Sequence, residues 1–418
     1  LVAEEPIVFV TTDVAPERIA AMEYLFSVWK HRYGGTDVVV EAIPEDELIA
    51  YLREADRDGR RIDVVNTGFD RMASEAVRGR LDTQLHAEIV QSITGRYIPE
   101  VRDRVRLSNG TYGAIPFHGW IQGIWIRRSA LERHDLDVPR SLEELIVALD
   151  TFAGDPKTPH PLVMGTEGGS YGEQFFLHLV DAAGVDIVGA DGRPTLTADP
   201  VVTTTQRYRM LSQYVAEGAG NTASRGRFLD GRSPVLVYST FIMDDLVNPA
   251  IVFGEEVPET AAGVVNDVEV IATLATASGA ASFISLNVLA VERGLSPRRR
   301  SEIAELIRFI LAPDSYNVWI HSAPGGMLPI FQDVVRSGSY MGDLEGVFLS
   351  YEPAILETLI DGFRHAPAIR RSDEARRTRR ILRASGLIGE LSRALIVDEH
   401  STTLTLVRFQ RRAEAIVR

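Results

Sequence analysis

The sequence predicts an α/β protein with more than one domain, and three observations support this class. The chain has 418 residues, which exceeds what a single hydrophobic core usually organises. Apolar residues make up 45% of the chain and charged residues 24%, which is typical of a globular protein with substantial cores. Segments with helical and strand periodicity alternate along the chain, and this alternation favours sheets covered by helices.

The first part of the chain predicts three short strands joined by helices. The strands are Ile7–Thr12, Asp37–Ile43 and Arg61–Val65, each rich in β-branched residues. Pro16 begins the helix after the first strand, and Glu45–Ala55 forms the helix after the second. This order predicts a parallel sheet with right-handed crossovers.

Acidic residues follow two of these strands. Asp13 comes directly after the first strand, and Asp70 comes a few residues after the third. Ligands of such sheets bind beyond the carboxyl ends of the strands, so both residues fall where a site would lie. An N-cap or a turn is the alternative role for each, and the sequence leaves that alternative open.

Residues 107–127 predict a β-hairpin. Asn109-Gly110 is a strong turn signal, and alternating apolar residues follow it. Because side chains alternate along a strand, we expect His118, Trp120 and Gln122 to share one face and Trp125 to lie on the other. We therefore expect Trp125 in the core.

The rest of the chain continues the α/β pattern. Ser141 and Glu144 have the spacing of a capping box at the start of a helix. A glycine-rich loop at residues 164–172 precedes another helix, and Pro200–Glu217 predicts a further one. Phe283–Val291 predicts a strand. These segments extend the α/β class beyond the first domain.

Charge, cysteine content and motifs exclude several classes of function. The net charge of -14 opposes binding to nucleic acid, and the absence of cysteine excludes disulfides and thiolate chemistry. There is no P-loop, no H-E-x-x-H motif and no G-x-S-x-G motif. No histidine pair has metal-ligand spacing, so we predict no metal and no cofactor. A glycosidase needs only two carboxylates at a set separation, so it stays open as an alternative.

The chain has features of an exported protein. It begins at Leu1, its first ten residues lack the basic region of a signal peptide, and it contains no thiol. No apolar run reaches the roughly 20 residues of a membrane-spanning helix. We expect a mature periplasmic or extracellular chain from which a signal segment has been removed.

Eight segments carry a family resemblance. They are, in order, IVFVTTD, WKHRYGGTDVVVEAI, RRIDVVNTGFDRMA, NGTYGAIPF, IRRSALERHDLDVPRSLEELIVALDTF, GRFLDGRSPVLVYSTF, AASFISLNVLAVERG and IAELIRFILAPDSYNVWIHSAPGGMLPIFQDV. In order and spacing they resemble bacterial extracellular solute-binding proteins of ABC importers, in the sugar-binding group of maltose and glycerol-phosphate receptors. The chain departs from the family pattern at Thr11-Thr12, at Arg127 and at Ser239-Thr240-Phe241.

The resemblance implies a two-lobed periplasmic-binding-protein-like fold of type II, with the ligand in a cleft between lobes joined by hinge strands. The lobes would comprise residues 1–113 with 284–321, and residues 114–283 with 322–418. Solute bound in such a cleft favours closure of the hinge, and a permease would recognise the closed form. The resemblance implies a binding protein and not an enzyme.

A sugar receptor needs flat apolar surfaces for C–H groups and directional polar groups for hydroxyls. The ligand-binding residues that we predict, on this basis and from the resemblance, are Asp13, Asp70, His118, Trp120, Glu167, Ser170, Tyr171, Tyr238, Phe241, Ala281, Gly325 and Arg364. Core packing, caps, linkers and surface charge are the alternative roles for members of this set, with Ser170 as an N-cap and Arg364 as surface charge.

The predicted function is capture of a mono- or oligosaccharide or polyol and its delivery to the permease subunits of an ABC transporter. We expect a monomer that reaches the membrane only through the permease or through a lipid anchor outside this chain. A receptor of the same fold for an anion or a polyamine is the alternative, with a glycoside-acting enzyme after it. An anion receptor would direct arginines and helix N-termini at the solute, whereas a polyamine receptor would use several carboxylates.

Overall fold

The computed structural model describes residues 5–216, 218, 220–276, 279–366, 372–398 and 400–418. The chain forms two compact units. Unit 1 comprises Leu1–Gly119 with Ser285–Glu345, and unit 2 comprises Trp120–Ile284 with Gly346–Arg418. Each unit therefore combines segments that are far apart in the sequence.

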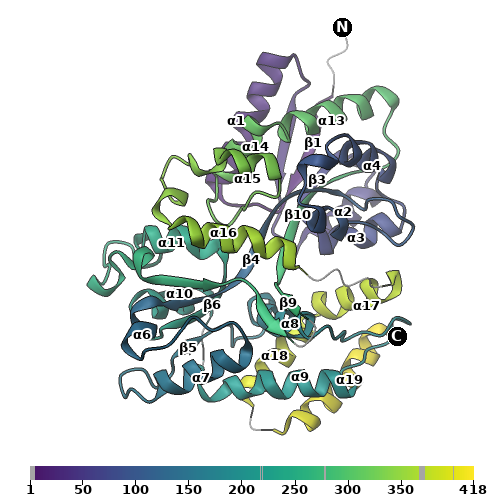
Figure 1. The fold of residues 1–418 in the computed structure, drawn as a ribbon. Coiled ribbons are helices and arrows are strands. Elements are labelled where there is room, and N and C mark those ends of the chain that lie inside the picture. The colour runs from purple at the N-terminus through teal and green to yellow at the C-terminus, as the bar shows by residue number, and fades with distance from the viewer. Residues whose placement is uncertain (1–4, 217, 219, 277–278, 367–371, 399) are drawn as a thin grey trace. The chain divides into compact units, whose positions relative to one another are not determined.

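Unit 1 is built on a four-stranded sheet in the order β2, β1, β3, β10 (Figure 1). These strands are Val38–Ala42, Ile7–Thr11, Val64–Gly68 and Ile284–Val291. β1 pairs in parallel with β2 and β3, as the sequence predicts, whereas β10 runs antiparallel to β3. The carboxyl ends of β1 and β3 therefore lie at the same edge of the sheet.

Helices cover this sheet. They are α1 (Pro16–Tyr33), α2 (Leu48–Arg57), α3 (Phe69–Val77), α4 (Thr83–Ser92), α5 (Pro99–Arg104), α13 (Pro297–Ile310), α14 (Pro313–Ile320) and α15 (Gln332–Ser337). α1 begins at Pro16, as predicted, and ends at Gly34, whose positive φ of 67° suits glycine. The ring of Phe9 packs 5.1 Å from Phe26 and 5.9 Å from Trp319, which joins α1 and α14 to the sheet.

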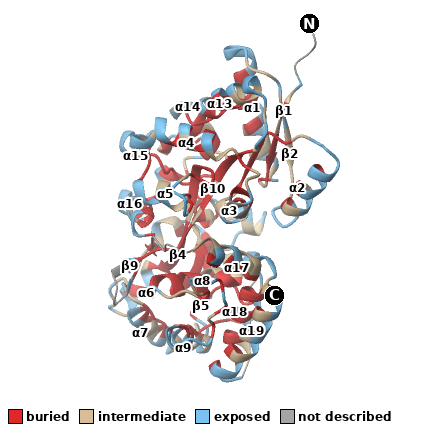
Figure 2. Ribbon diagram, turned by 90° about the vertical axis from the view of Figure 1, so that its right-hand side faces the viewer, coloured by how far each residue is buried: buried red, intermediate tan, exposed pale blue. Residues whose placement is uncertain are grey.

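Unit 2 has a sheet in which β4 (Ile115–Arg127) pairs antiparallel with β6 (Val235–Ser239) and β7 (Val268–Ile271). The short β5 (Leu162–Val163) pairs in parallel with β6, and β8 (Leu274–Thr276) pairs with β9 (Gly279–Ala281). Most residues of β4 are buried (Figure 2), and so are most residues of β6.

The helices of unit 2 come from both of its segments. They are α6 (Arg128–Arg133), α7 (Leu142–Ala153), α8 (Ser170–Ala182), α9 (Asp199–Arg209), α10 (Asn221–Leu229), α11 (Met243–Val247), α12 (Ala250–Phe253), α16 (Pro353–Gly362), α17 (Asp373–Ala384), α18 (Leu387–Val397) and α19 (Thr402–Val417). The core includes Phe176 of α8, Leu391 of α18 and Phe409 of α19. α8 is therefore covered by the C-terminal helices.

Backbone contact joins α8 and α18. A Cβ atom on Gly389 of α18 would lie 2.3 Å from the backbone nitrogen of Gly169, in the loop before α8. Within that loop, a Cβ on Gly165 would lie 2.7 Å from the backbone nitrogen of Gly172. Only glycine allows such close approach of two backbones. The glycine-rich loop therefore rests directly on α18.

Several elements differ from the sequence-based prediction. Asn109-Gly110 forms the predicted turn, but the hairpin has only the single bridge between Arg106 and Tyr112 before the long strand β4 begins. The third strand begins at Val64, because the carboxylate of Asp63 accepts a hydrogen bond from the backbone nitrogen of Val8. The helix predicted to extend from Pro200 gives way to a 3-10 turn at residues 210–213, and residue 217 lies outside the described residues.

The compact units also divide the chain differently from the predicted lobes. Residues 322–345, which we predicted in the second lobe, lie in unit 1. The backbone of Leu328 exchanges two hydrogen bonds with Gly119, and the ring of Phe331 packs 4.9 Å from that of Tyr97. These long-range contacts hold the segment in unit 1, and the sequence gives no local signal for them.

Candidate functional site

In unit 1, Asp13 lies just beyond the carboxyl end of β1. Its Oδ1 atom accepts a hydrogen bond from Nη1 of Arg18 at 2.9 Å, and its backbone nitrogen donates to Oγ1 of Thr11. Its Oδ2 atom is buried and has no hydrogen-bond partner among the described residues. Burial raises the pKa of Asp13, and Arg18 opposes that rise. The carboxylate therefore keeps one oxygen able to accept a hydrogen bond.

His118 of β4 is the second predicted site residue of unit 1 that is buried and polar. The imidazole is 1% exposed, and neither ring nitrogen has a partner in the part of the chain that the structure describes. Burial, together with the charge of Arg18, lowers the pKa of His118 to about 3. The ring is therefore neutral and offers one donor and one acceptor. Because Arg18 acts on both His118 and Asp13, the two predicted residues belong to one group.

Side-chain hydrogen bonds between β1, β3 and β10 hold this group in place. Oγ1 of Thr11 donates to Oδ1 of Asn66 at 3.1 Å, and Nδ2 of Asn66 donates to the carbonyl oxygen of Val288 at 3.3 Å. Oγ1 of Thr12 donates to Oγ1 of Thr67 at 3.1 Å. These contacts link the end of β1 to the middle of β3 and, through Asn66, to β10, so they fix the backbone from which Asp13 extends.

The other two predicted residues of unit 1 have roles that their local backbone explains. Asp70 is exposed in the first turn of α3, where its negative charge interacts favourably with the helix macrodipole and stabilises the helix. Gly325 is buried in a turn after α14 with a φ of 83°, a conformation that favours glycine. The positive φ of this turn therefore accounts for a glycine at position 325.

In unit 2, Tyr171 of α8 and Tyr238 of β6 form an aromatic pair. Their ring centroids are 5.3 Å apart in an edge-on arrangement. The hydroxyl of Tyr171 donates to the carbonyl oxygen of Val237 at 3.0 Å, and the hydroxyl of Tyr238 donates to Oδ1 of Asn221. Burial raises the pKa of Tyr238 to about 12 and that of Tyr171 further. Because both hydroxyls are engaged, these residues offer ring surface rather than polar groups.

A charged group that the sequence analysis missed lies beside Tyr238. Nη1 of Arg225 donates to Oδ2 of Asp245 at 2.7 Å, and the Asp245 side chain is 1% exposed. Burial, and then the charge of Asp245, raise the pKa of Asp244 to about 7. The adjacent acids within the apolar stretch FIMDDLV were the available signal. One of these two adjacent carboxylates, that of Asp245, is thus paired with a guanidinium.

Glu167 lies close to this aromatic pair. It is exposed in the loop before α8, and a Cβ on Gly220 would lie 2.5 Å from its Oε2 atom. Gly220 directly precedes Asn221, the partner of Tyr238. The structure therefore brings the predicted residues Glu167, Tyr171 and Tyr238 to the start of α10.

Trp120 and Phe283 form a second aromatic pair in unit 2. Trp120 is half-buried, and its ring centroid lies 6.1 Å from that of Phe283. The carbonyl oxygen of the predicted residue Ala281 lies 3.4 Å from Nε2 of the buried His178. The ring of His178 lies 6.3 Å from Phe283. A chain of contacts therefore runs from the ring of Trp120 through the rings of Phe283 and His178 to the backbone of Ala281.

The remaining predicted residues have simpler environments. Ser170 is exposed at the first position of α8, where Gly169 and not Ser170 occupies the N-cap. Phe241 is half-buried in the 3-10 turn at residues 240–242. Arg364 is exposed and forms an ion pair of 2.9 Å with Asp361, which is the surface role considered as its alternative. Trp125 is fully buried, as predicted, and its Nε1 donates to the carbonyl oxygen of Tyr238.

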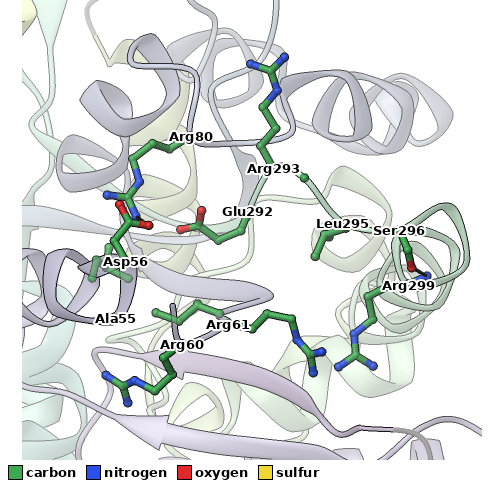
Figure 3. A pocket seen from close by; sticks show the side chains of 13 residues that line it. Ala55, Asp56, Arg60, Arg61, Arg80, Glu292, Arg293, Leu295, Ser296 and Arg299 are labelled. Carbon is green, nitrogen blue, oxygen red and sulfur yellow. Dashed lines mark hydrogen bonds and ion pairs between the residues drawn. The ribbon is translucent and has the colours of Figure 1, made fainter. Parts of the chain in front are cut away.

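A charged pocket of about 350 Å³ lies elsewhere in unit 1, next to residues that precede β3 and follow β10. Its side chains include five arginines and two acids (Figure 3). In Figure 3 the guanidinium groups of Arg61 and Arg299 lie side by side, and both form ion pairs with the buried Asp63. Arg80 pairs with Asp56 at 2.9 Å. The pocket thus lies beside the opposite end of β3 from Asn66, and its ion pairs stabilise the fold.

No group of three or more histidine, aspartate or glutamate residues within the described parts of the chain is arranged to hold a metal ion. Among the helices described, none combines the length and apolar character needed to cross a membrane.

Comparison with known proteins identifies relatives of this chain. The family model of bacterial extracellular solute-binding proteins matches residues 15–281. YcjN of Escherichia coli (strain K12), an ABC transporter periplasmic-binding protein, is 22% identical over 335 residues, which cover 79% of this chain and 74% of YcjN.

Solved structures show the same fold. Maltose-bound MalE3 of T. maritima matches with a TM-score of 0.72 at 16% identity, over 98% of this chain and 99% of that chain. A solute-binding protein from Agrobacterium radiobacter K84, in complex with ribitol, matches with a TM-score of 0.74 at 15% identity, over 99% and 100% of the two chains. These matches confirm the predicted α/β class and the two-lobed binding-protein fold.

Proposed function

Since the chain belongs to the bacterial extracellular solute-binding proteins and is the solute-binding component of an ABC transporter, we propose that its solute is a neutral carbohydrate or polyol. The observation that carries this proposal is that each unit, taken by itself, offers one of the two kinds of surface that a sugar needs. Unit 1 offers a buried carboxylate oxygen beside a neutral imidazole, and unit 2 offers aromatic rings whose hydroxyls are already engaged.

These two kinds of surface suit the chemistry of sugars. Hydroxyl groups need directional donors and acceptors, which Asp13 and His118 supply. The C–H faces of a sugar ring pack on aromatic surface, which Trp120, Tyr171 and Tyr238 supply. Maltose and ribitol, which two structural relatives bind, have the same combination of hydroxyls and C–H groups.

The charges favour a neutral solute over an anion or a polyamine. Arg18 is paired with Asp13, and Arg225 is paired with Asp245, so neither guanidinium is reserved for an anion. Each of these carboxylates likewise has a cationic partner, whereas a polyamine receptor would need carboxylates without one. Asp244 is half-protonated near pH 7, since its pKa is about 7, and adds little fixed charge.

The remaining predicted residues, Asp70, Glu167, Ser170, Phe241, Ala281, Gly325 and Arg364, stay proposals as contributors to the same site. Among them, Glu167 has the strongest support, because it lies beside Gly220 near the aromatic pair. Arg364 has the weakest, because its charge is paired with Asp361 at the surface.

We also propose how binding leads to transport. A solute that contacts residues of both units stabilises the arrangement in which both can reach it. The permease subunits would recognise that arrangement and accept the solute. We propose that the protein acts as a monomer in the periplasm or outside the cell, after removal of a signal segment, and meets the membrane through the permease or a lipid anchor. It would bind its solute without chemical change.

Calorimetric titration against maltose, glucose, ribitol, glycerol phosphate and spermidine tests the choice of solute. We expect binding of at least one sugar or polyol, and a weakening of tenfold or more in Asp13→Asn and in Trp120→Ala. Trp125→Phe is the matched control, because Trp125 is buried in the core, and it should bind as the wild type does. Binding of only the phosphate or the polyamine would replace the carbohydrate proposal, and hydrolysis of an added oligosaccharide would defeat the receptor proposal.

A further inference from the structure

Gln122 of β4 is a fully buried amide in the interior of unit 2. Its side chain is 0% exposed, and it lies opposite Ser239 in the antiparallel pairing with β6. Ile124 and Ile126, which follow on the same face of the strand, belong to the hydrophobic core. Gln122 therefore stands where this face of β4 otherwise carries apolar residues.

Within the described residues the amide of Gln122 is unpaired. Neither Oε1 nor Nε2 forms a hydrogen bond with a protein group there. A buried amide without partners destabilises a folded protein more than an apolar side chain of the same size at the same place. Folding alone therefore favours leucine or methionine at this position, and the glutamine needs another explanation.

The surroundings of Gln122 contain further unpartnered polar atoms. Its backbone nitrogen donates to the carbonyl oxygen of Phe283 at 2.9 Å. The ring of Phe283 lies between those of Trp120, at 6.1 Å, and His178, at 6.3 Å. Nδ1 of His178 is also buried without a partner among the residues that are described. Burial lowers the pKa of His178 to about 4, so this ring is a neutral polar group.

Trp120 connects this buried group to solvent. It precedes Gln122 by two residues on the same face of β4, and it is half-buried whereas Gln122 is not exposed at all. Two residues of a strand span roughly 7 Å, and a glutamine side chain covers much of that distance. A molecule that packs on Trp120 would thus come within reach of the amide.

We propose that Gln122 determines specificity by binding one hydroxyl group of the solute that packs on Trp120. The amide can donate through Nε2 and accept through Oε1, so it matches a hydroxyl, which also does both. A hydrogen atom in place of that hydroxyl would leave the amide unpaired, and a site of this kind rejects a deoxy analogue strongly. This inference rests on the proposed function, because it assumes a polyhydroxylated solute.

Gln122→Leu tests the inference, with Ile124→Leu as the matched control on the same face of the same strand. We expect Gln122→Leu to bind the best of maltose, glucose and ribitol at least tenfold more weakly than the wild type. Its melting temperature should be equal or higher, because an unpaired amide is removed. Ile124→Leu should keep the affinity of the wild type. Gln122→Met, which is unbranched, replaces Gln122→Leu if the leucine variant does not fold.

A set of monodeoxy analogues of the best-binding probe gives a second readout. One analogue should bind the wild type at least tenfold more weakly than the parent, and Gln122→Met should bind that analogue and the parent with similar affinity. If Gln122→Leu and Gln122→Met bind every probe as the wild type does, the amide has a structural role and the inference is wrong. If the wild type binds no sugar or polyol at all, the proposed function fails, and the inference fails with it.

Discussion

Glu292→Gln should stabilise the protein progressively as the pH rises from about 4.5 to about 7, and fully above that. Glu292 directly follows β10 and lines the charged pocket, where its carboxylate points toward Asp56 and Arg80 (Figure 3). Burial raises the pKa of Glu292 from 4.5 to about 7, with Arg80 opposing the rise and Asp56 adding to it. The folded protein therefore holds this carboxylate in ionised form at a cost.

The size of the effect follows from the pKa. Since each tenfold change in a proton affinity is worth about 1.4 kcal/mol, a rise from 4.5 to about 7 gives a cost of at most about 3 kcal/mol. Partial exposure of the side chain lowers this to about 1–2 kcal/mol. Because the folded pKa is raised, the favourable contribution is complete below about pH 4.5 and is lost as the pH rises through about 7.

Urea unfolding near pH 4.5 and near pH 8 measures the effect. Glutamine resembles the protonated carboxyl, so Glu292→Gln should match the wild type near pH 4.5 and exceed its free energy of unfolding near pH 8 by about 1–2 kcal/mol. Glu23→Gln, on the exposed face of α1, is the control and should show no such difference. An equal difference between Glu292→Gln and the wild type at both pH values would refute the reasoning.

Three further predictions concern other contacts. Arg379→Met should cost about 1.5–3 kcal/mol of stability, because the buried Asp181 would lose the charge-assisted hydrogen bond that Arg379 donates at 3.0 Å; an unchanged free energy of unfolding in urea contradicts this. Ser141→Ala should cost about 1 kcal/mol, since Oγ of Ser141 accepts from the backbone nitrogen of Glu144, and an unchanged thermal midpoint would exclude that role. The imidazole of His118 should stay neutral down to about pH 4, its pKa being about 3, and an NMR titration that protonates it near pH 6 would disprove the burial argument.

Local patterns were sufficient for much of the fold. The β-branched runs marked β1 and β2 to within a residue or two, because backbone preference and burial act together there. Ser141 was recognisable as a cap, and its hydroxyl does accept from the backbone nitrogen of Glu144, although the carboxylate of Glu144 accepts from Arg140 instead of completing the reciprocal pair. Signals of this kind depend on residues within one turn or one strand.

Features that depend on distant partners could not be predicted. The position of residues 322–345 in unit 1 depends on hydrogen bonds between Leu328 and Gly119. The sequence predicted Asp13 as a site residue because the end of a strand is a local feature. It could not predict that Oδ2 of Asp13 is buried without a partner among the described residues. The burial of Gln122 likewise follows from its pairing with Ser239, more than a hundred residues away. The ion pair between Arg225 and Asp245 joins residues about twenty positions apart.

The backbone contact between Gly389 and Gly169 has a practical consequence for any use of this protein as a solute sensor. The loop that carries Glu167 rests on α18, so the shape of that loop depends on a helix near the end of the chain. A truncation before residue 387 would remove α18, against which the loop packs, while leaving α8 in the sequence. A fluorescent reporter is therefore best fused beyond α19, and a dye near Glu167 would also report on the integrity of the C-terminal helices.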